Sequence, residues 1–383
     1  MRKIRLTMIA ISILGLATIP ALAFHDQGVA HCNGCHTMHN SQDNAAVNYG
    51  PFDGRDNPGS GTPQFTGYND LLLKGNKTDL CLLCHDGGGG YHVWSADPAA
   101  PDVGTAERGG GDFVFLEEDN INEGHGGATN PILGNQTGHN VISLVRGTAA
   151  DPDIDTSPGG AYKSVDLHCT SCHDPHGSRG FRLTYQLGQT QNGDYGSEAI
   201  FAATIVAEGI GTRDGAETAD NHNAYHSGYS AWCGTCHDSI HTGGPNIHPA
   251  GASMNGQAAV YNAYNGTSDC IANEPTTPGG NCGSGDFTTA YLAQVPFEDA
   301  STAVTSTEGP NSNSLVACVS CHRAHATSAQ DAGRWDFNVT GLAEDGHESS
   351  SYPIFNPYDE YQRSLCNKCH AQDVYDTLVD FTP

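Results

Sequence analysis

The sequence predicts a chain that is mostly coil, with short α-helices and little β structure. Gly (48 residues) and Pro (19 residues) make up about a sixth of the 383 residues. Runs such as DGGGG (86–90), ERGGGD (107–112) and DPDIDTSPGG (151–160) have neither a helical nor a strand period. The hydrophobic fraction is only 37%, so the chain needs covalent staples or a bound hydrophobic mass to fold.

The first 23 residues have the features of a secretory signal peptide. A charged start, MRKIR, precedes an apolar run that ends in the small-residue cleavage signal ALA (21–23). No later stretch reaches the roughly 20 apolar residues that cross a bilayer. We therefore expect a signal peptide over 1–23, a single mature domain over 24–383, no transmembrane segment, and export through the periplasm.

Twelve of the 14 cysteines fall into six copies of one pattern, C-x-x-C-H. This pattern is the attachment signal for c-type haem. Two thiols separated by two residues on a helical turn reach the two vinyl groups on one haem edge, and the next imidazole then lies under the iron. A zinc ribbon does not require His after every C-x-x-C, and a redox dithiol sits on a βαβ pattern, which is not visible.

The sequence therefore predicts six covalently bound c-type haems. The predicted attachment residues are Cys32, Cys35, Cys81, Cys84, Cys169, Cys172, Cys233, Cys236, Cys318, Cys321, Cys366 and Cys369. The predicted proximal iron ligands are His36, His85, His173, His237, His322 and His370.

Fourteen of the 20 histidines lie outside the motifs, whereas the chain has only four Met. His is therefore the expected second axial ligand of each iron. An iron with two imidazole ligands exchanges electrons but has no open position for substrate. This favours an electron carrier over an enzyme. A multihaem oxyanion reductase, which needs a five-coordinate iron, stays open as an alternative because Lys368 lies inside the last motif.

Three of the spare histidines share one context. His39, His176 and His325 each lie three residues after the motif His of the first, third and fifth motifs. A His so close on the same turn points away from its own iron, so we expect it to serve another haem. The remaining candidate distal ligands are His92, His139, His248, His25 and His241. We expect surface or haem-edge positions for His31, His125, His168, His222, His226 and His347.

The spacing of the motifs predicts how the chain is organised. The 360 mature residues provide about 60 per haem, so the haems must form the core in van der Waals contact, with short helices around each motif. Longer helices are expected over 198–209 and 367–381. The two cysteines outside the motifs, Cys270 and Cys282, are expected to form a disulfide because the chain is exported, and such a loop is worth about 3 kcal/mol.

The segments around the motifs resemble a known family. FHDQGVAHCNGCHTMHNS (24–41), LHCTSCHDPHG (167–177), WCGTCHDSIHTGGPNIHPAG (232–251), NSNSLVACVSCHRAHA (311–326) and YQRSLCNKCHA (361–371) are similar to OmcS-like hexahaem c-type cytochromes. These lie on the outer surface of metal-reducing bacteria and polymerise into conducting filaments. The resemblance covers the mature length, while the intervening loops and the pair of extra cysteines differ.

The resemblance implies a role for His39. In this family the His three residues after the first motif ligates a haem of the adjacent subunit, which here would be the fifth haem of the next protomer. The pattern of trailing histidines suggests a further rule: His176 would ligate the first iron and His325 the third. A ligand shared between subunits makes a head-to-tail contact, which gives an open filament unless the rotation closes.

The charge balance limits the partners. Sixteen Lys and Arg against 43 Asp and Glu give a net charge of −27, which excludes nucleic acid as a partner. Other redox cytochromes and extracellular metal acceptors remain compatible. The sequence thus predicts a secreted or outer-surface electron carrier that polymerises. The alternative is a monomeric periplasmic or surface electron shuttle with the same haems.

Overall fold

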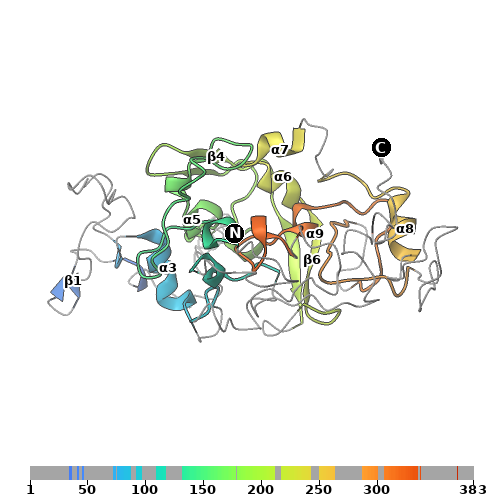
Figure 1. The fold of residues 1–383 in the computed structure, drawn as a ribbon, viewed down its shortest axis with the longest axis horizontal. Helices are drawn as coiled ribbons and strands as arrows, with labels where there is room; N and C mark the ends of the chain where they lie inside the picture. The colour runs from blue at the N-terminus through green and yellow to red at the C-terminus, as the bar shows by residue number, and fades with distance from the viewer. Residues whose placement is uncertain are drawn as a thin grey trace, which may run out of the picture.

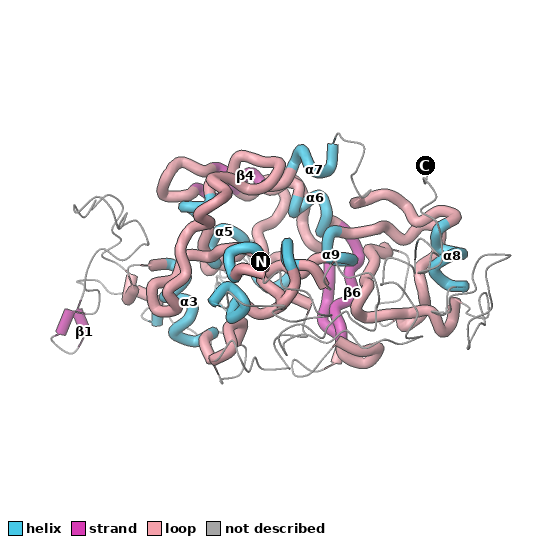
Figure 2. Tube along the Cα trace, viewed as in Figure 1, coloured by secondary structure: helices cyan, strands magenta, loops and turns pink. Residues whose placement is uncertain are grey.

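The structure is a computed structural model of the chain. It describes residues 34–36, 41–42, 45–46, 72–74, 76–87, 92–96, 109–117, 132–177, 179–211, 217–242, 250–263, 287–300, 306–334, 337 and 369. Most of this part of the chain is loop and turn, as Figure 2 shows. The predicted class, mostly coil with short helices and little β structure, is confirmed.

The helices of the described residues are short. The α-helices are α3 (Lys77–His85), α5 (Cys169–Cys172), α6 (Tyr229–Cys233), α7 (Asp238–Thr242), α8 (Gln257–Ala263) and α9 (Cys318–Cys321). The 3-10 helices are η2 (Phe113–Glu117), η4 (Gly134–Gln136), η5 (Ser164–Asp166), η6 (Phe181–Leu183) and η7 (Gln330–Ala332). The helices α3, α5, α6 and α9 contain or reach an attachment cysteine, so the expectation of short helices at the motifs is confirmed for these four.

The strands form three separate antiparallel pairs. They are β1 (Ser41–Gln42) with β2 (Ala45–Ala46), β3 (Thr190–Asn192) with β4 (Glu198–Ile200), and β5 (Val206–Ile210) with β6 (His222–Ser227). The β5–β6 pair is the longest and has a register shift between Val206 and Ala207. In Figure 1, β6 lies close to α9, near the middle of the molecule.

The predicted helix over 198–209 is wrong. Residues 198–200 form β4 and residues 206–210 form β5. Burial alternates with a period of two, because Ala199 and Phe201 are buried whereas Ile200 is exposed. This is the pattern of a strand with one face on the protein. Pairing with neighbouring strands outweighs the helical preference of the alanines in this segment.

The polypeptide supplies an apolar cluster of its own. Trp94, Phe113, Phe115 and Tyr261 are its largest buried members, and Cys321 of the fifth motif packs against it. The expected haem core is therefore supplemented by aromatic side chains of the chain. Within the described residues, no helix is long and apolar enough to cross a membrane.

Two further expectations fall outside the described residues. They are the Cys270–Cys282 disulfide and, apart from Cys369, the helix over 367–381. Both stay predictions.

Candidate haem-binding sites

Short helical turns hold the two cysteines of the third and fifth motifs. In the third motif the Ser171 hydroxyl accepts the N–H of His168 at 3.0 Å and donates to the Asp166 carbonyl at 2.8 Å. In the fifth motif the Ser320 hydroxyl accepts the N–H of Ala317 at 3.1 Å. The serine before the second Cys therefore accepts the N–H of the N-cap residue of each turn, which is one half of a capping box.

The second and fourth motifs are fixed in other ways. In α3 the Asn76 side chain caps the helix by accepting the N–H groups of Thr78 and Asp79. In α6 the Glu298 carboxylate accepts the N–H groups of Tyr229 and Ser230, where a negative charge is favourable because it faces the positive end of the helix.

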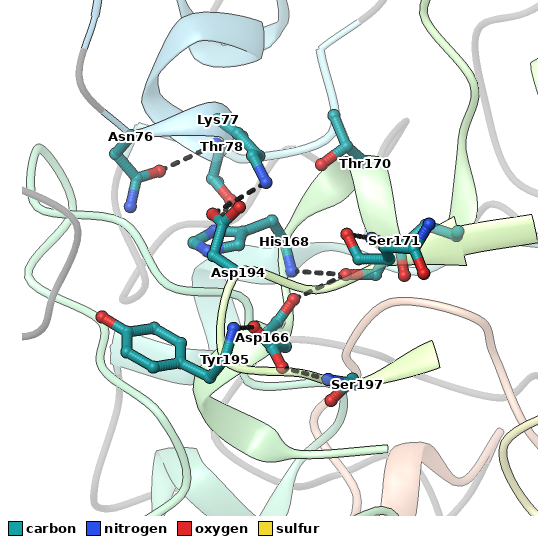
Figure 3. A network of polar contacts seen from close by, with 12 residues as sticks. Asn76, Lys77, Thr78, Asp166, His168, Thr170, Ser171, Asp194, Tyr195 and Ser197 are labelled. Carbon is teal, nitrogen blue, oxygen red and sulfur yellow. Dashed lines mark hydrogen bonds and ion pairs between the residues drawn. The ribbon is translucent and has the colours of Figure 1, made fainter. Parts of the chain in front are cut away.

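Figure 3 shows the polar network that joins the second motif to the third. Thr78 in α3 is hydrogen-bonded to the His168 ring at 3.3 Å, just before Cys169. Lys77 forms an ion pair with Asp194 at 2.8 Å. The Asp166 carboxylate accepts the N–H groups of Tyr195 at 2.7 Å and of Ser197 at 3.0 Å. The two motifs are thereby held in fixed relative positions.

The odd-numbered motifs share a return segment. The motif His forms an isolated bridge with a later residue: His36 with Leu72, His173 with Thr184, and His322 with Gly333. In each case the next residue donates its N–H to the carbonyl of the second motif Cys. These donors and acceptors are Leu73 and Cys35 at 2.8 Å, Tyr185 and Cys172 at 3.2 Å, and Arg334 and Cys321 at 2.7 Å.

We call residues 167–185 the third motif unit and residues 316–334 the fifth motif unit. In both, the Nδ1–H of the motif His donates to a carbonyl nine residues later: His173 to Arg182 at 2.9 Å and His322 to Asp331 at 2.8 Å. Both acceptor residues have left-handed backbone, with φ of 51° for Arg182 and 58° for Asp331. Such strain in non-Gly residues persists where the surrounding structure fixes it, commonly at functional sites.

Four other described histidines use the same arrangement. The Nδ1–H of His222 donates to the Thr218 carbonyl at 3.1 Å, and that of His226 donates to the Asp299 carbonyl at 3.2 Å. The Nδ1–H of His237 donates to the Pro158 carbonyl at 2.9 Å, and that of His139 donates to the Ala324 carbonyl at 2.9 Å. A backbone acceptor on Nδ1 fixes the tautomer and the ring direction and leaves Nε2 as the metal-binding nitrogen. These imidazoles are therefore prepared to ligate iron.

Three pairs of imidazoles stand at the spacing of a shared iron. Their ring centroids are 6.0 Å apart for His36 and His176, 6.0 Å for His139 and His237, and 6.5 Å for His173 and His325. Two imidazoles that bind one metal ion from opposite sides, with bonds of about 2.0–2.1 Å, leave their centroids roughly 6 Å apart. Each pair joins one motif His to one other His, so the residues fit the haem that the motifs imply.

The protonation states of these rings suit metal binding. Burial lowers the pKa of His139 to about 4 and that of His325 to about 3. Burial also lowers the pKa of His173. All three rings are therefore neutral at pH 7, and neutral imidazole is the form that binds a metal.

The ring of His325 is held by the apolar cluster. Phe113 stacks on it with centroids 4.4 Å apart. A Cβ on Gly110 would lie 3.4 Å from the His325 ring, and a Cβ on Gly111, whose φ is +80°, would lie 2.2 Å from the Ala326 carbonyl oxygen. The glycine run at 109–111 is therefore a close-packed support for this histidine, not a structureless loop.

The attachment cysteines of successive motifs meet in an alternating order. The thiols of Cys81 and Cys169, the first cysteines of motifs two and three, are hydrogen-bonded. Cys172 and Cys236, the second cysteines of motifs three and four, interact electrostatically. Motifs four and five meet again through their first cysteines, Cys233 and Cys318. In Figure 1 the motif helices follow in the order α3, α5, α6, α9 along the long axis of the molecule.

Other predicted site residues are less fully placed. His92 is buried, and the N–H of the next residue, Val93, donates to the His85 carbonyl at 3.0 Å. His241 lies in α7, directly after the fourth motif. The sixth motif contacts α8 through Gln257, whose amide donates to the Cys369 carbonyl at 2.8 Å. Six predicted haem-site residues lie outside the described residues, as do the two cysteines of the predicted disulfide: Cys32, His39, His25, His248, Cys366 and His370.

The structure corrects the expected exposure of two histidines. His168 and His222 are only 4% and 7% exposed, so a surface position is wrong for both, while the haem-edge alternative stays a prediction. His168 is covered because it precedes the third motif and contacts Thr78 of α3. His222 is covered because it begins β6 and packs on Tyr291.

Sequence reasoning missed a buried ionic cluster at the fifth motif. Arg323 and Arg334 both pair with one oxygen of Glu217, at 3.0 Å and 2.7 Å. The available signal was Arg323, which follows the motif His directly in a chain with only 16 Lys and Arg. Its burial could not be foreseen, because Glu217 lies about a hundred residues earlier in the sequence.

The repeated attachment motif and the paired imidazoles define a class of protein, the multihaem c-type cytochromes. No protein-family profile matches the chain. The C-type cytochrome OmcS of Geobacter sulfurreducens is 30% identical over 456 aligned positions, covering 97% of this chain and 99% of the relative. This chain therefore belongs to the OmcS family of c-type cytochromes, which confirms an electron-carrying, haem-binding protein and not an enzyme.

Two solved structures agree with this assignment. The Outer Membrane Cytochrome S filament of Geobacter sulfurreducens has a TM-score of 0.70 at 28% identity and covers 91% of this chain. A cryo-EM structure of OmcS nanowires from the same organism has a TM-score of 0.67 at 29% identity and also covers 91%. Both solved chains are matched over their full length.

Proposed function

We propose that this protein carries electrons outside the cell through six bis-His c-type haems and polymerises head-to-tail into a conducting filament. Its acceptors are extracellular metal compounds such as metal oxides, and its other partners are redox cytochromes. Bound haem supplies reversible one-electron chemistry at iron. The polypeptide attaches each haem, fills both axial positions and sets the distance between neighbours.

The paired imidazoles are the single observation that carries this proposal. Three motif histidines each face a second histidine at 6.0–6.5 Å between ring centroids. From the pairs we infer that His176 ligates the first iron, His325 the third and His139 the fourth. The first two assignments follow the rule of the trailing histidines. For the second and sixth irons, His92, His248, His25 and His241 remain the candidates.

The alternation of cysteine contacts supports a continuous chain of haems. First cysteines meet between motifs two and three, second cysteines between three and four, and first cysteines between four and five. Extended in both directions, this order predicts second-cysteine contacts for motifs one with two and five with six. The next contact in this order joins first cysteines. The first cysteine of motif six would then meet the first cysteine of motif one in another protomer.

A shared ligand would make that junction specific. The solved relatives are described as a filament and as nanowires, which supports self-assembly. By the resemblance, His39 would ligate the fifth iron of the neighbouring protomer. Under this proposal, the trailing histidine of the first motif ligates an iron of another chain. The trailing histidines of the third and fifth motifs ligate irons of their own chain.

The test combines haem counting with spin state. Mass spectrometry of the secreted protein should give six haems per chain, and electron paramagnetic resonance of the ferric filament should show low-spin iron throughout, because two imidazoles impose a strong ligand field. A high-spin fraction near one sixth, with turnover of a small oxyanion, would support a reductase instead. A single small species in sedimentation at micromolar concentration, fully low-spin, would support the monomeric shuttle.

A further inference from the structure

The buried cluster of Arg323, Arg334 and Glu217 contacts the fifth motif directly. Arg323 follows the proximal ligand His322, and Arg334 donates from its backbone N–H to the Cys321 carbonyl at 2.7 Å. The Nε–H of Arg334 also donates to the Val319 carbonyl at 2.6 Å. The Arg334 guanidinium is therefore hydrogen-bonded to the turn that attaches the fifth haem, and Arg323 pairs with the same carboxylate as Arg334.

The cluster carries an excess of positive charge. Two guanidiniums, which stay protonated in proteins, share one carboxylate, and the side chains of both arginines are 0% exposed. The Arg334 Nη2 atom is buried and has no hydrogen-bond partner among the described residues. A buried charge without a counter-charge is costly, so the cluster suits one further anionic oxygen, such as that of a haem propionate.

The third motif unit lacks this charge at equivalent positions. Asp174 occupies the place of Arg323, because both donate their N–H to the return segment at 2.8 Å. Tyr185 occupies the place of Arg334, because both donate to the carbonyl of the second motif Cys. Arg182 in the third unit and Asp331 in the fifth are both exposed, so solvent and salt screen their charges.

We propose that the Arg323–Arg334–Glu217 cluster raises the reduction potential of the fifth haem above that of the third, making it an electron-holding centre along the chain. A positive charge in a low-dielectric environment stabilises the iron state with the additional electron. Asp174 at the equivalent position in the third unit acts in the opposite direction. This inference rests on the proposed haem binding and concerns the chain's own charges.

The test uses two substitutions with opposite expected signs. Glu217→Gln removes the negative charge and should shift one sixth of the spectroelectrochemical titration amplitude to higher potential. Arg334→Gln removes a positive charge and should shift one sixth to lower potential, whereas Arg334→Lys, which keeps the charge, should stay near the wild type. A purely structural role would shift the reduction potential of both Gln variants in the same direction or shift neither. Either result would overturn the proposal.

Two controls separate this proposal from its alternatives. Arg179→Met removes an exposed arginine near the third motif and should leave the titration unchanged, because solvent screens that charge. Titrating inorganic phosphate at constant ionic strength tests the source of the anion. If the reduction potential of the wild type depends on phosphate and that of Arg334→Gln does not, the anion at Arg334 is a free anion and not a haem propionate. Haem content below six per chain would instead contradict the proposed function.

Discussion

The third and fifth motif units can be compared position by position. In both, a serine closes the helical turn that carries the two cysteines, and the carbonyl of a left-handed residue nine positions after the motif His accepts its Nδ1–H. Both place a His three residues after the proximal ligand. They differ in charge, with Asp174 in one and Arg323 in the other. The two units thus share one backbone arrangement around the attachment motif, and under the proposal above the charges beside it set the difference in reduction potential.

In the proposed assignment the two units also differ in where the second imidazole comes from. The third iron is assigned His325 of the same chain, whereas the fifth is assigned His39 of a neighbour. His39→Ala should therefore abolish or strongly shorten filaments, because it removes one coordination bond at every junction. Negative-stain microscopy and sedimentation measure this loss. Arg179→Ala, at an exposed residue, is the control and should leave filaments intact; normal filaments in His39→Ala would contradict the assignment.

A second prediction concerns the support of the third iron's ligand. Phe113 is 4% exposed and stacks on the His325 ring at 4.4 Å. Phe113→Ala should lower the free energy of unfolding by about 3–5 kcal/mol, the usual cost of deleting a buried Phe. Guanidinium unfolding monitored by circular dichroism measures it. Leu187→Ala, at a residue 67% exposed, should change stability little, and equal effects of the two changes would contradict the packing described.

The smallest predicted effect tests the likeness of the two units. Ser171→Ala and Ser320→Ala each remove the hydroxyl that accepts the N–H of the N-cap residue of the motif turn. Each should cost about 1 kcal/mol, as for other lost helix caps. Because both serines accept the same backbone N–H, both losses should lie near this value in matched unfolding curves. The Ser171→Ala loss should be the larger, since the Ser171 hydroxyl also accepts from the Tyr162 hydroxyl at 2.9 Å. A loss near zero in either variant would contradict the capping role.

Sequence alone predicted the parts of the site that are local. The six motifs and the three trailing histidines are short patterns whose chemistry follows from spacing, and they led to the assignments of His176 and His325. The helix predicted over 198–209 failed because β6, which pairs with part of it, lies beyond a loop. The ion pairs of Arg323 and Arg334 could not be predicted either, because the carboxylate that both contact belongs to Glu217, which is remote in sequence.

The central claim is that the trailing histidine of one odd motif completes the iron of the preceding odd motif. Electron paramagnetic resonance of ferric His325→Ala tests it most directly. The account predicts one additional high-spin iron per chain relative to the wild type in the same state, in the filament and in a verified monomer alike, while haem content stays at six per chain. A His325→Ala protein with all irons low-spin would contradict the account.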